Sequence, residues 1–66
     1  MKKELMDLIK NKYGTIDNML NYTDKISRAY LYQLTSGKKR NVSIDIAKEI
    51  IRLLDIDSID ELAEML

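Results

Sequence analysis

Residues 27–41 read SRAYLYQLTSGKKRN, which combines a helix, its end and a basic loop. Leu31 and Leu34 lie three apart and share one helix face, the spacing that is typical of a helix packed against a core. The side chains left outside that face are Arg28, Ala29, Tyr32 and Gln33. The stretch therefore predicts a surface helix that presents a mostly polar face to solvent or to a partner.

Both ends of this helix carry residues that commonly cap helices. Ser27 can accept a hydrogen bond from a backbone amide of the first turn, and Gly37 can adopt the left-handed conformation that closes many helices. These signals predict a helix over residues 27–36. A loop with three consecutive cations, residues 38–40, follows it directly.

Four more stretches have apolar residues at helical spacing, and none shows the alternating pattern of a strand. They cover residues 2–13, 16–22, 43–55 and 58–66. Gly14, Thr15 and Ser43 mark helix ends, while Ser58 and Glu61 form a capping-box pattern. The apolar residues expected at the centre of the core are Ile44, Ala47, Ile50, Ile51 and Leu54. The sequence predicts a compact all-α domain of five short helices.

The composition narrows the chemistry that the chain can perform. Its 66 residues suffice for one small domain over residues 1–66, and they include 0 Cys and 0 His. Disulfides and Cys/His metal sites are therefore excluded, and no metal, cofactor or enzyme activity is expected. The N-terminal stretch lacks the apolar run of a signal peptide and no later stretch could span a membrane, so the expected location is cytoplasmic.

Charge is distributed unevenly along a chain whose formal net charge is +0. Residues 1–42 hold nine Lys or Arg against four acids, a net charge of +5, whereas residues 43–66 hold two against seven, a net charge of −5. A basic half joined to an acidic half fits a protein that offers one face to a polyanion and another face to a different partner. Composition alone would also allow solvated helix faces.

From residue 26 to residue 57 the sequence ISRAYLYQLTSGKKRNVSIDIAKEIIRLLDID resembles the Cro/C1-type (XRE-like) helix-turn-helix domains of phage and bacterial repressors. The shared pattern is Ile-Ser-Arg, two apolar seam positions, Gly-Lys at the helix end, a basic loop, and Ser before a long helix. The resemblance implies a lambda-repressor-like fold and a sequence-specific DNA-binding regulator. In that family residues 16–22 would be the first helix of the motif, and residues 27–36 the recognition helix in the major groove.

The resemblance gives the outward residues specific roles. Arg28 would pair with guanine, Gln33 with adenine, and Ala29 would contact a thymine methyl group. Tyr32 could contact a base edge or a phosphate. Phosphate contacts are expected at Ser27, Lys38, Lys39, Arg40 and Asn41. Taken singly, the same residues would more often form a solvated face and a soluble loop, but their shared placement on one helix and its following loop favours the DNA-binding roles.

Four positions differ from the usual pattern of the family, and all lie before the recognition helix. They are Asp17, Asn21, Asp24 and Lys25. Asp17 replaces a Gln that braces a phosphate, and a carboxylate there repels phosphate. Lys25 replaces the turn glycine, so a left-handed conformation there costs about 1 kcal/mol or more. We expect a turn at residues 22–25 that is built differently and lengthened, with Tyr22 filling the space beside it.

Two functions follow from these features. In the first, the protein is a Cro-like repressor that covers a promoter as a homodimer on double-stranded DNA, using half-sites about one helical turn apart. In the second, it is an antirepressor or interaction module that binds another repressor through its acidic half. The candidate dimer surface is Ile56, Ile59, Leu62, Met65 and Leu66, with the alternative that most of these pack inward.

Overall fold

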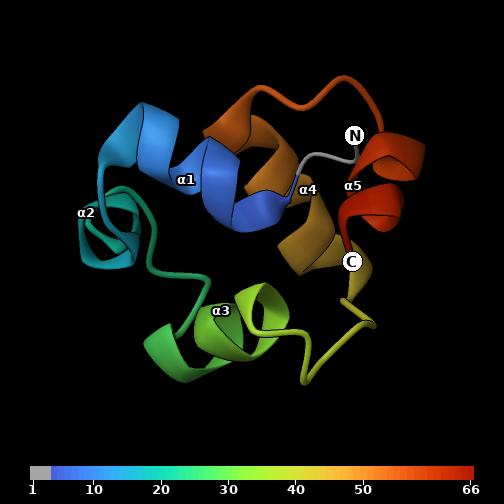
Figure 1. Ribbon diagram of the computed structural model, residues 1–66, viewed down its shortest axis with the longest axis horizontal. Helices are drawn as coiled ribbons and strands as arrows, with labels where there is room; N and C mark the ends of the chain where they lie inside the picture. Colours follow the sequence, from blue (N-terminus) through green and yellow to red (C-terminus); the bar gives the residue numbers. More distant parts are fainter. Residues whose placement is uncertain (1–3) are drawn as a thin grey trace.

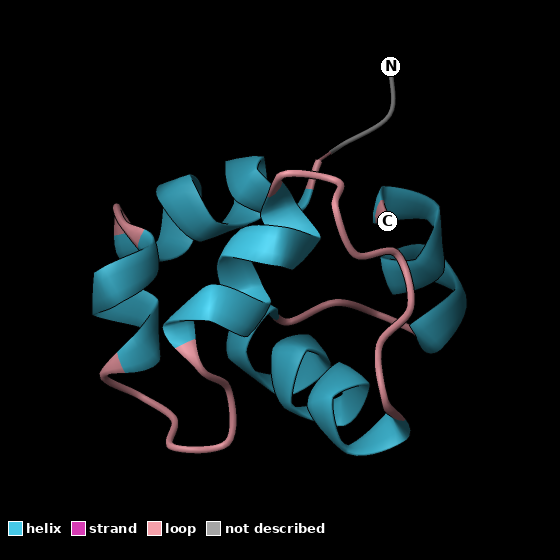
Figure 2. Cartoon of the chain, turned by 90° about the horizontal axis from the view of Figure 1, so that it is seen from below, coloured by secondary structure: helices cyan, strands magenta, loops and turns pink. Residues whose placement is uncertain are grey.

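The computed structural model describes residues 4–66, which form five α-helices and no strand, so the all-α prediction is confirmed for that range. The helices are α1 (Leu5–Tyr13), α2 (Ile16–Leu20), α3 (Arg28–Thr35), α4 (Ile44–Leu54) and α5 (Ile59–Met65). In Figure 1, α4 lies near the centre, α1 and α2 lie on one side, α3 lies below and α5 lies on the opposite side. Figure 2 shows that extended loops precede and follow α3.

The core draws on every helix. Its most deeply buried side chains are Ile9, Met19, Leu31, Ile50 and Leu62, one from each helix. Fully burying a side chain of this size contributes about 1.5–3 kcal/mol relative to leaving it exposed. The five helices therefore share one core, and the side of each helix that faces it is fixed.

Local capping explains where the helices begin and end. The predicted N-caps are Thr15, Ser27, Ser43 and Ser58. The side chain of each accepts a hydrogen bond from the backbone amide three residues later, over 3.1–3.4 Å. Gly14 and Gly37 both have φ = 83°, the left-handed region that favours glycine. These cap predictions are confirmed.

Several boundaries differ from the sequence-based expectation. α1 begins at Leu5 with Glu4 as its N-cap, and residues 2–3 of its expected range lie outside the described residues. α2 ends at Leu20, two residues earlier than expected. Glu61 accepts a hydrogen bond from the backbone amide of Asp57 over 3.3 Å, so its side chain reaches one residue further back than in a standard capping box.

One residue that we expected in the core lies on the surface. Ile44 is 66% exposed because it occupies the first position of α4, before that helix turns its apolar side inward. Ala47, Ile50 and Leu54 are buried as expected. No helix within residues 4–66 is long and apolar enough to cross a membrane.

Candidate nucleic-acid interface

The outward face of α3 is set by the residues that the helix buries. Leu31 and Leu34 are buried, and so is Ile26 just before the helix. The four predicted base-contact residues are exposed together on the opposite side: Arg28, Ala29, Tyr32 and Gln33. Because the buried leucines fix the rotation of α3 about its axis, this outward face is an ordered surface.

An ion pair links α3 to α2 at this surface. The Arg28 guanidinium contacts Asp17 Oδ1 through Nε at 2.9 Å and through Nη2 at 2.6 Å. The two side chains are 64% and 57% exposed. Asp17 occupies the Nε edge of the guanidinium, so the Nη1–Nη2 edge remains available as a pair of donors.

Sequence analysis placed Asp17 beside a phosphate and did not identify it as the partner of Arg28. The sequence offered one indication of this pairing, which is that Asp17 and Arg28 have opposite charges and lie in the first turns of consecutive helices. Their pairing depends on how α2 and α3 cross, and residue spacing alone does not give that crossing. The contact orients Arg28 and also places a carboxylate at the edge of the predicted DNA surface.

The basic loop folds back onto α3. After Gly37, the backbone amide of Lys39 donates to the carbonyl oxygen of Gln33 over 3.0 Å. The Lys39 ammonium lies 5.1 Å from the centre of the Tyr30 ring, a cation–π contact. The Tyr30 hydroxyl accepts a hydrogen bond from the amide of Ser43 over 3.4 Å, which ties the far end of the loop to the same ring.

The remaining predicted phosphate contacts lie next to this anchor. Lys38, Arg40 and Asn41 are exposed, whereas Lys39 is half-buried. The Ser27 hydroxyl oxygen accepts from the Tyr30 amide over 3.1 Å, and its own proton stays available to a further acceptor. The structure thus places an ordered cationic loop directly after the exposed face of α3.

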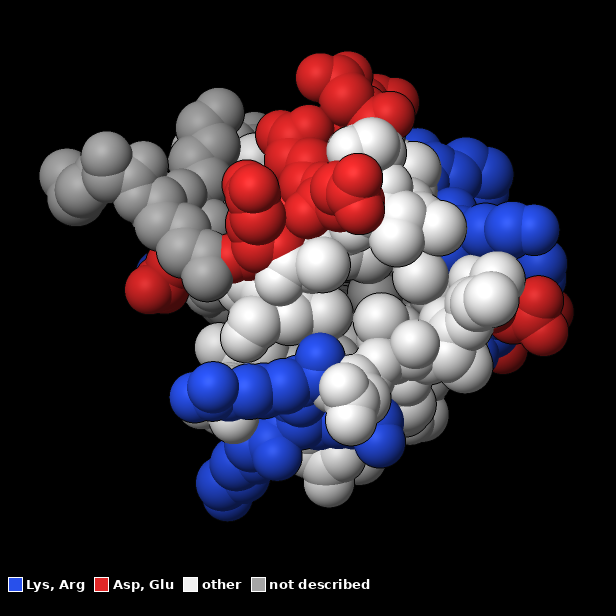
Figure 3. Space-filling model, turned by 90° about the vertical axis from the view of Figure 1, so that its right-hand side faces the viewer, with Lys and Arg blue, Asp and Glu red and all other residues white. Residues whose placement is uncertain are grey.

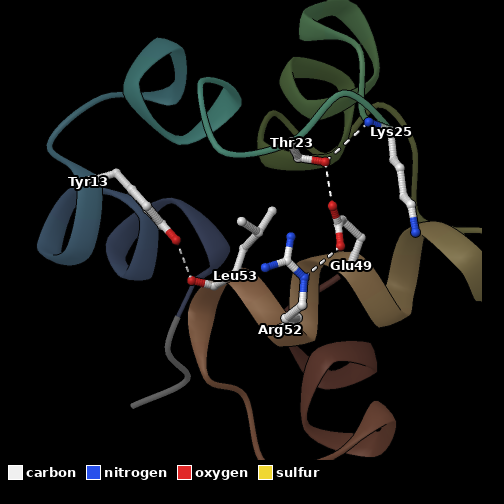
Figure 4. A network of polar contacts seen from close by, with 6 residues as sticks. All are labelled: Tyr13, Thr23, Lys25, Glu49, Arg52 and Leu53. Carbon is white, nitrogen blue, oxygen red and sulfur yellow. Dashed lines mark hydrogen bonds and ion pairs between the residues drawn. The ribbon is translucent and has the colours of Figure 1, made fainter.

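The segment between α2 and α3 runs over residues 21–27 and is longer than a tight turn, as we expected. Among the described residues, Asp55 is the only non-glycine residue with positive φ, so Lys25 does not adopt the costly left-handed conformation. Instead the Thr23 hydroxyl accepts from the Lys25 amide over 3.1 Å and donates to Glu49 Oε2 on α4 (Figure 4).

Tyr22 does not fill the space beside this turn. Its side chain is 66% exposed, and its ring lies 5.3 Å from the ring of Tyr13. The buried residue of the segment is Ile26, which anchors its far end in the core. Tyr13 in turn donates from its hydroxyl to the carbonyl oxygen of Leu53 over 2.7 Å (Figure 4), which joins α1 to the end of α4.

Glu49 is the one charged residue that is buried within residues 4–66, at 7% exposure. Its carboxylate accepts hydrogen bonds from Arg52 Nε at 2.9 Å and from Thr23, with the positive charge of Lys25 nearby. These contacts outweigh the effect of burial and lower the pKa of Glu49 from 4.5 to about 2. Glu49 is one of the seven acids counted in residues 43–66, and its connection to the segment before α3 was not predicted from the sequence.

The candidate dimer residues fall into two groups. Ile56 and Leu62 belong to the core, because α5 and the loop before it dock through them. Contrary to the dimer prediction, these two side chains are not available to a partner. Ile59 is 49% exposed, while Met65 and Leu66 are half-buried. Ile59 and Leu66 line an apolar groove between α4 and α5.

Comparison of the chain with protein-family models, with curated proteins and with solved structures gave no match. Within residues 4–66, no three acidic side chains gather closely enough to hold a metal ion. The function is therefore inferred from the chemistry and placement of the surface residues.

Proposed function

We propose that the protein is a sequence-specific DNA-binding transcriptional regulator that acts as a Cro-like repressor. The observation that carries this proposal is the exposed side of α3, where Arg28, Ala29, Tyr32 and Gln33 share one surface and lead directly into the cationic loop. A helix of this kind fits the major groove, and the loop after it would lie against the phosphate backbone.

Each exposed side chain of α3 is assigned to a different contact with the DNA bases or phosphates. The free Nη1–Nη2 edge of Arg28 matches the O6 and N7 acceptors of guanine, and the Gln33 amide matches N6 and N7 of adenine. Ala29 is small enough to let the helix approach and to contact a thymine methyl group. Tyr32 contributes either a ring against a base edge or a hydroxyl to a phosphate.

The phosphate contacts fix the position of the helix and carry no sequence information. They are assigned to Ser27, Lys38, Lys39, Arg40 and Asn41. Lys39 is held over Tyr30 and is therefore already oriented. A single α3 reaches only a few base pairs, so tight binding needs two copies on half-sites about one helical turn apart. The bound pair would repress transcription by covering the promoter.

The experiment that tests this proposal is selection from a randomised duplex pool, followed by fluorescence-anisotropy titration at several salt concentrations. We expect an enriched inverted repeat whose affinity falls steeply with salt. Lys10→Ala on α1 is the matched control, because it removes an exposed cation from a helix away from α3 and should leave binding unchanged. Absence of binding to any duplex at low salt contradicts the proposal.

A second candidate function is an interaction module of the same fold that binds another repressor. It is favoured by the acidic C-terminal half, where α5 is flanked by the apolar groove. In that case a repressor protein is captured and no duplex is enriched. The selection experiment therefore separates the two functions.

A further inference from the structure

An apolar groove of about 460 Å³ crosses one face of the molecule, between the start of α4, the loop before it and α5. Its lining includes Ile44, Ile59, Ala63 and Leu66. Ile44 and Ile59 are among the four most exposed large apolar side chains of the described residues. Each is the first residue of its helix and lies outside the buried core. Two large exposed aliphatic side chains on one groove indicate a surface that a partner could cover.

The charges around this groove are separated by sign. Figure 3 shows the face with acidic side chains along its upper edge, basic side chains along its lower edge and a largely uncharged band between them, while further basic and acidic side chains lie together at the right-hand edge. The acidic edge belongs to α5 and the loop before it, with exposed Asp57, Asp60 and Glu64. The basic edge belongs to the loop after α3, with exposed Lys38 and with Arg40, which also lines the groove.

We propose that this face binds a second copy of the same chain, turned upside down relative to the first. A two-fold axis along the uncharged band brings the acidic edge of each copy onto the basic edge of the other, and the two apolar bands meet at the centre. Each charge contact then occurs twice, as in any interface between identical surfaces. The other two-fold arrangement, with both copies upright, sets acidic edge against acidic edge and basic edge against basic edge, which is repulsive.

The inverted arrangement has a consequence for α3. The basic edge directly follows α3, so inversion turns the exposed faces of the two α3 helices to opposite sides of the dimer. It also covers Arg40, which the proposed function assigns to a phosphate. Such a dimer could not place both helices on one duplex, so it is a DNA-free form that duplex dissociates, and the DNA-bound pair of the proposed function would meet through a surface other than Ile59 and Leu66. This consequence rests on the proposed function, whereas the dimer itself does not.

The dimer is tested by sedimentation equilibrium of the full chain without DNA, at low and high salt. We expect a monomer–dimer equilibrium whose dimer affinity falls as salt rises from about 0.05 M to about 1 M. The reason is that the screening length for the attraction between the acidic and basic edges shortens to about 3 Å at about 1 M salt. An apolar contact alone would be unchanged or strengthened by salt. A chain that stays monomeric at low salt and millimolar concentration, or a dimer that salt does not weaken, overturns the proposal.

Charge reversal tests the orientation. Arg40→Glu and Asp60→Lys should each raise the dimer dissociation constant by about tenfold, because each change acts at two equivalent contacts. The double variant should recover most of the affinity, since the edges are again opposite in charge. Lys10→Glu on α1 is the control and should change the constant less than twofold. Failure of the double variant to recover, with all variants folded by circular dichroism, overturns the inverted arrangement whether or not the protein binds DNA.

Discussion

Replacing Thr23 by Val should destabilise the domain, because it removes a half-buried hydroxyl that makes two hydrogen bonds. The Thr23 hydroxyl donates to Glu49 and accepts from the Lys25 amide, so it joins α4 to the segment that leads into α3. A hydrogen bond to a charged group contributes about 1.5–3 kcal/mol. For a domain of this size each kcal/mol shifts the melting temperature by about 4–8 °C, so we expect a decrease of about 6–24 °C.

The pH dependence separates this contact from a general loss of packing. The pKa of Glu49 is lowered in the folded protein to about 2, so its contribution to stability is fully present above the ordinary value of 4.5 and is lost as pH falls toward 2. The difference in unfolding free energy between the parent and Thr23→Val should therefore be larger at pH 7 than at pH 2, where only the loss of the Lys25 amide contact remains. Urea titrations followed by circular dichroism at both pH values measure it.

Thr35→Val is the matched control for this prediction. Thr35 is half-buried like Thr23, but its hydroxyl donates only to carbonyl oxygens of its own helix, those of Leu31 and Tyr32. The same substitution there should change the unfolding free energy by less than about 0.5 kcal/mol. If Thr23→Val costs no more than Thr35→Val, or costs the same at both pH values, then the Thr23–Glu49 contact does not stabilise the segment before α3.

Three further changes test other parts of the structure. Asp17→Asn should strengthen binding to every duplex, because it removes a negative charge from the protein surface that is proposed to face DNA. It should also reduce discrimination between duplexes, because Arg28 loses its ion-pair partner. Unchanged discrimination in anisotropy titrations would show that Asp17 does not orient Arg28. Gly37→Ala should lower the unfolding free energy by about 1 kcal/mol, because φ at this position is 83°, a conformation that alanine rarely adopts. The loss comes from the backbone alone, since nothing lies within 4 Å of an added Cβ. An unchanged unfolding free energy in urea titrations would show that the loop relaxes. Lys12→Ala should remove the 2.6 Å contact with Asp55 and leave the melting temperature almost unchanged, because that pair is exposed; a clear decrease of the melting temperature would show a packing role.

The sequence predicted most helices well because the signals that define them are local. Thr15, Ser27, Ser43 and Ser58 cap helices through amides only three residues away, so their roles can be seen in a short window. Apolar spacing likewise identified Leu31 and Leu34 as the buried side of α3, and with them the side that stays exposed.

The errors occurred where structure depends on contacts between distant residues. Thr23 and Glu49 are 26 positions apart, and Asp17 and Arg28 are 11 apart, so neither contact has a spacing that a helical pattern reveals. A different, longer turn at residues 22–25 could be expected from the cost of a left-handed Lys25, but Tyr22 was wrongly expected to fill the space beside it, because the Thr23 contact that holds the segment was not visible in the sequence. Ile44 was misplaced because a residue at the first position of a helix can follow the apolar period and still point away from the core.

The most direct test of the proposed function compares Gln33→Ala with Lys38→Ala on two duplexes, the best selected site and a shuffled sequence of equal length, by fluorescence anisotropy over a salt series. We predict that Gln33→Ala weakens binding by about 1–3 kcal/mol on the selected site only. Lys38→Ala should weaken both duplexes alike and reduce the salt slope by about one. Equal losses on both duplexes for Gln33→Ala, or no duplex binding by the parent protein at low salt, would contradict the assignment of α3 as a sequence-reading helix.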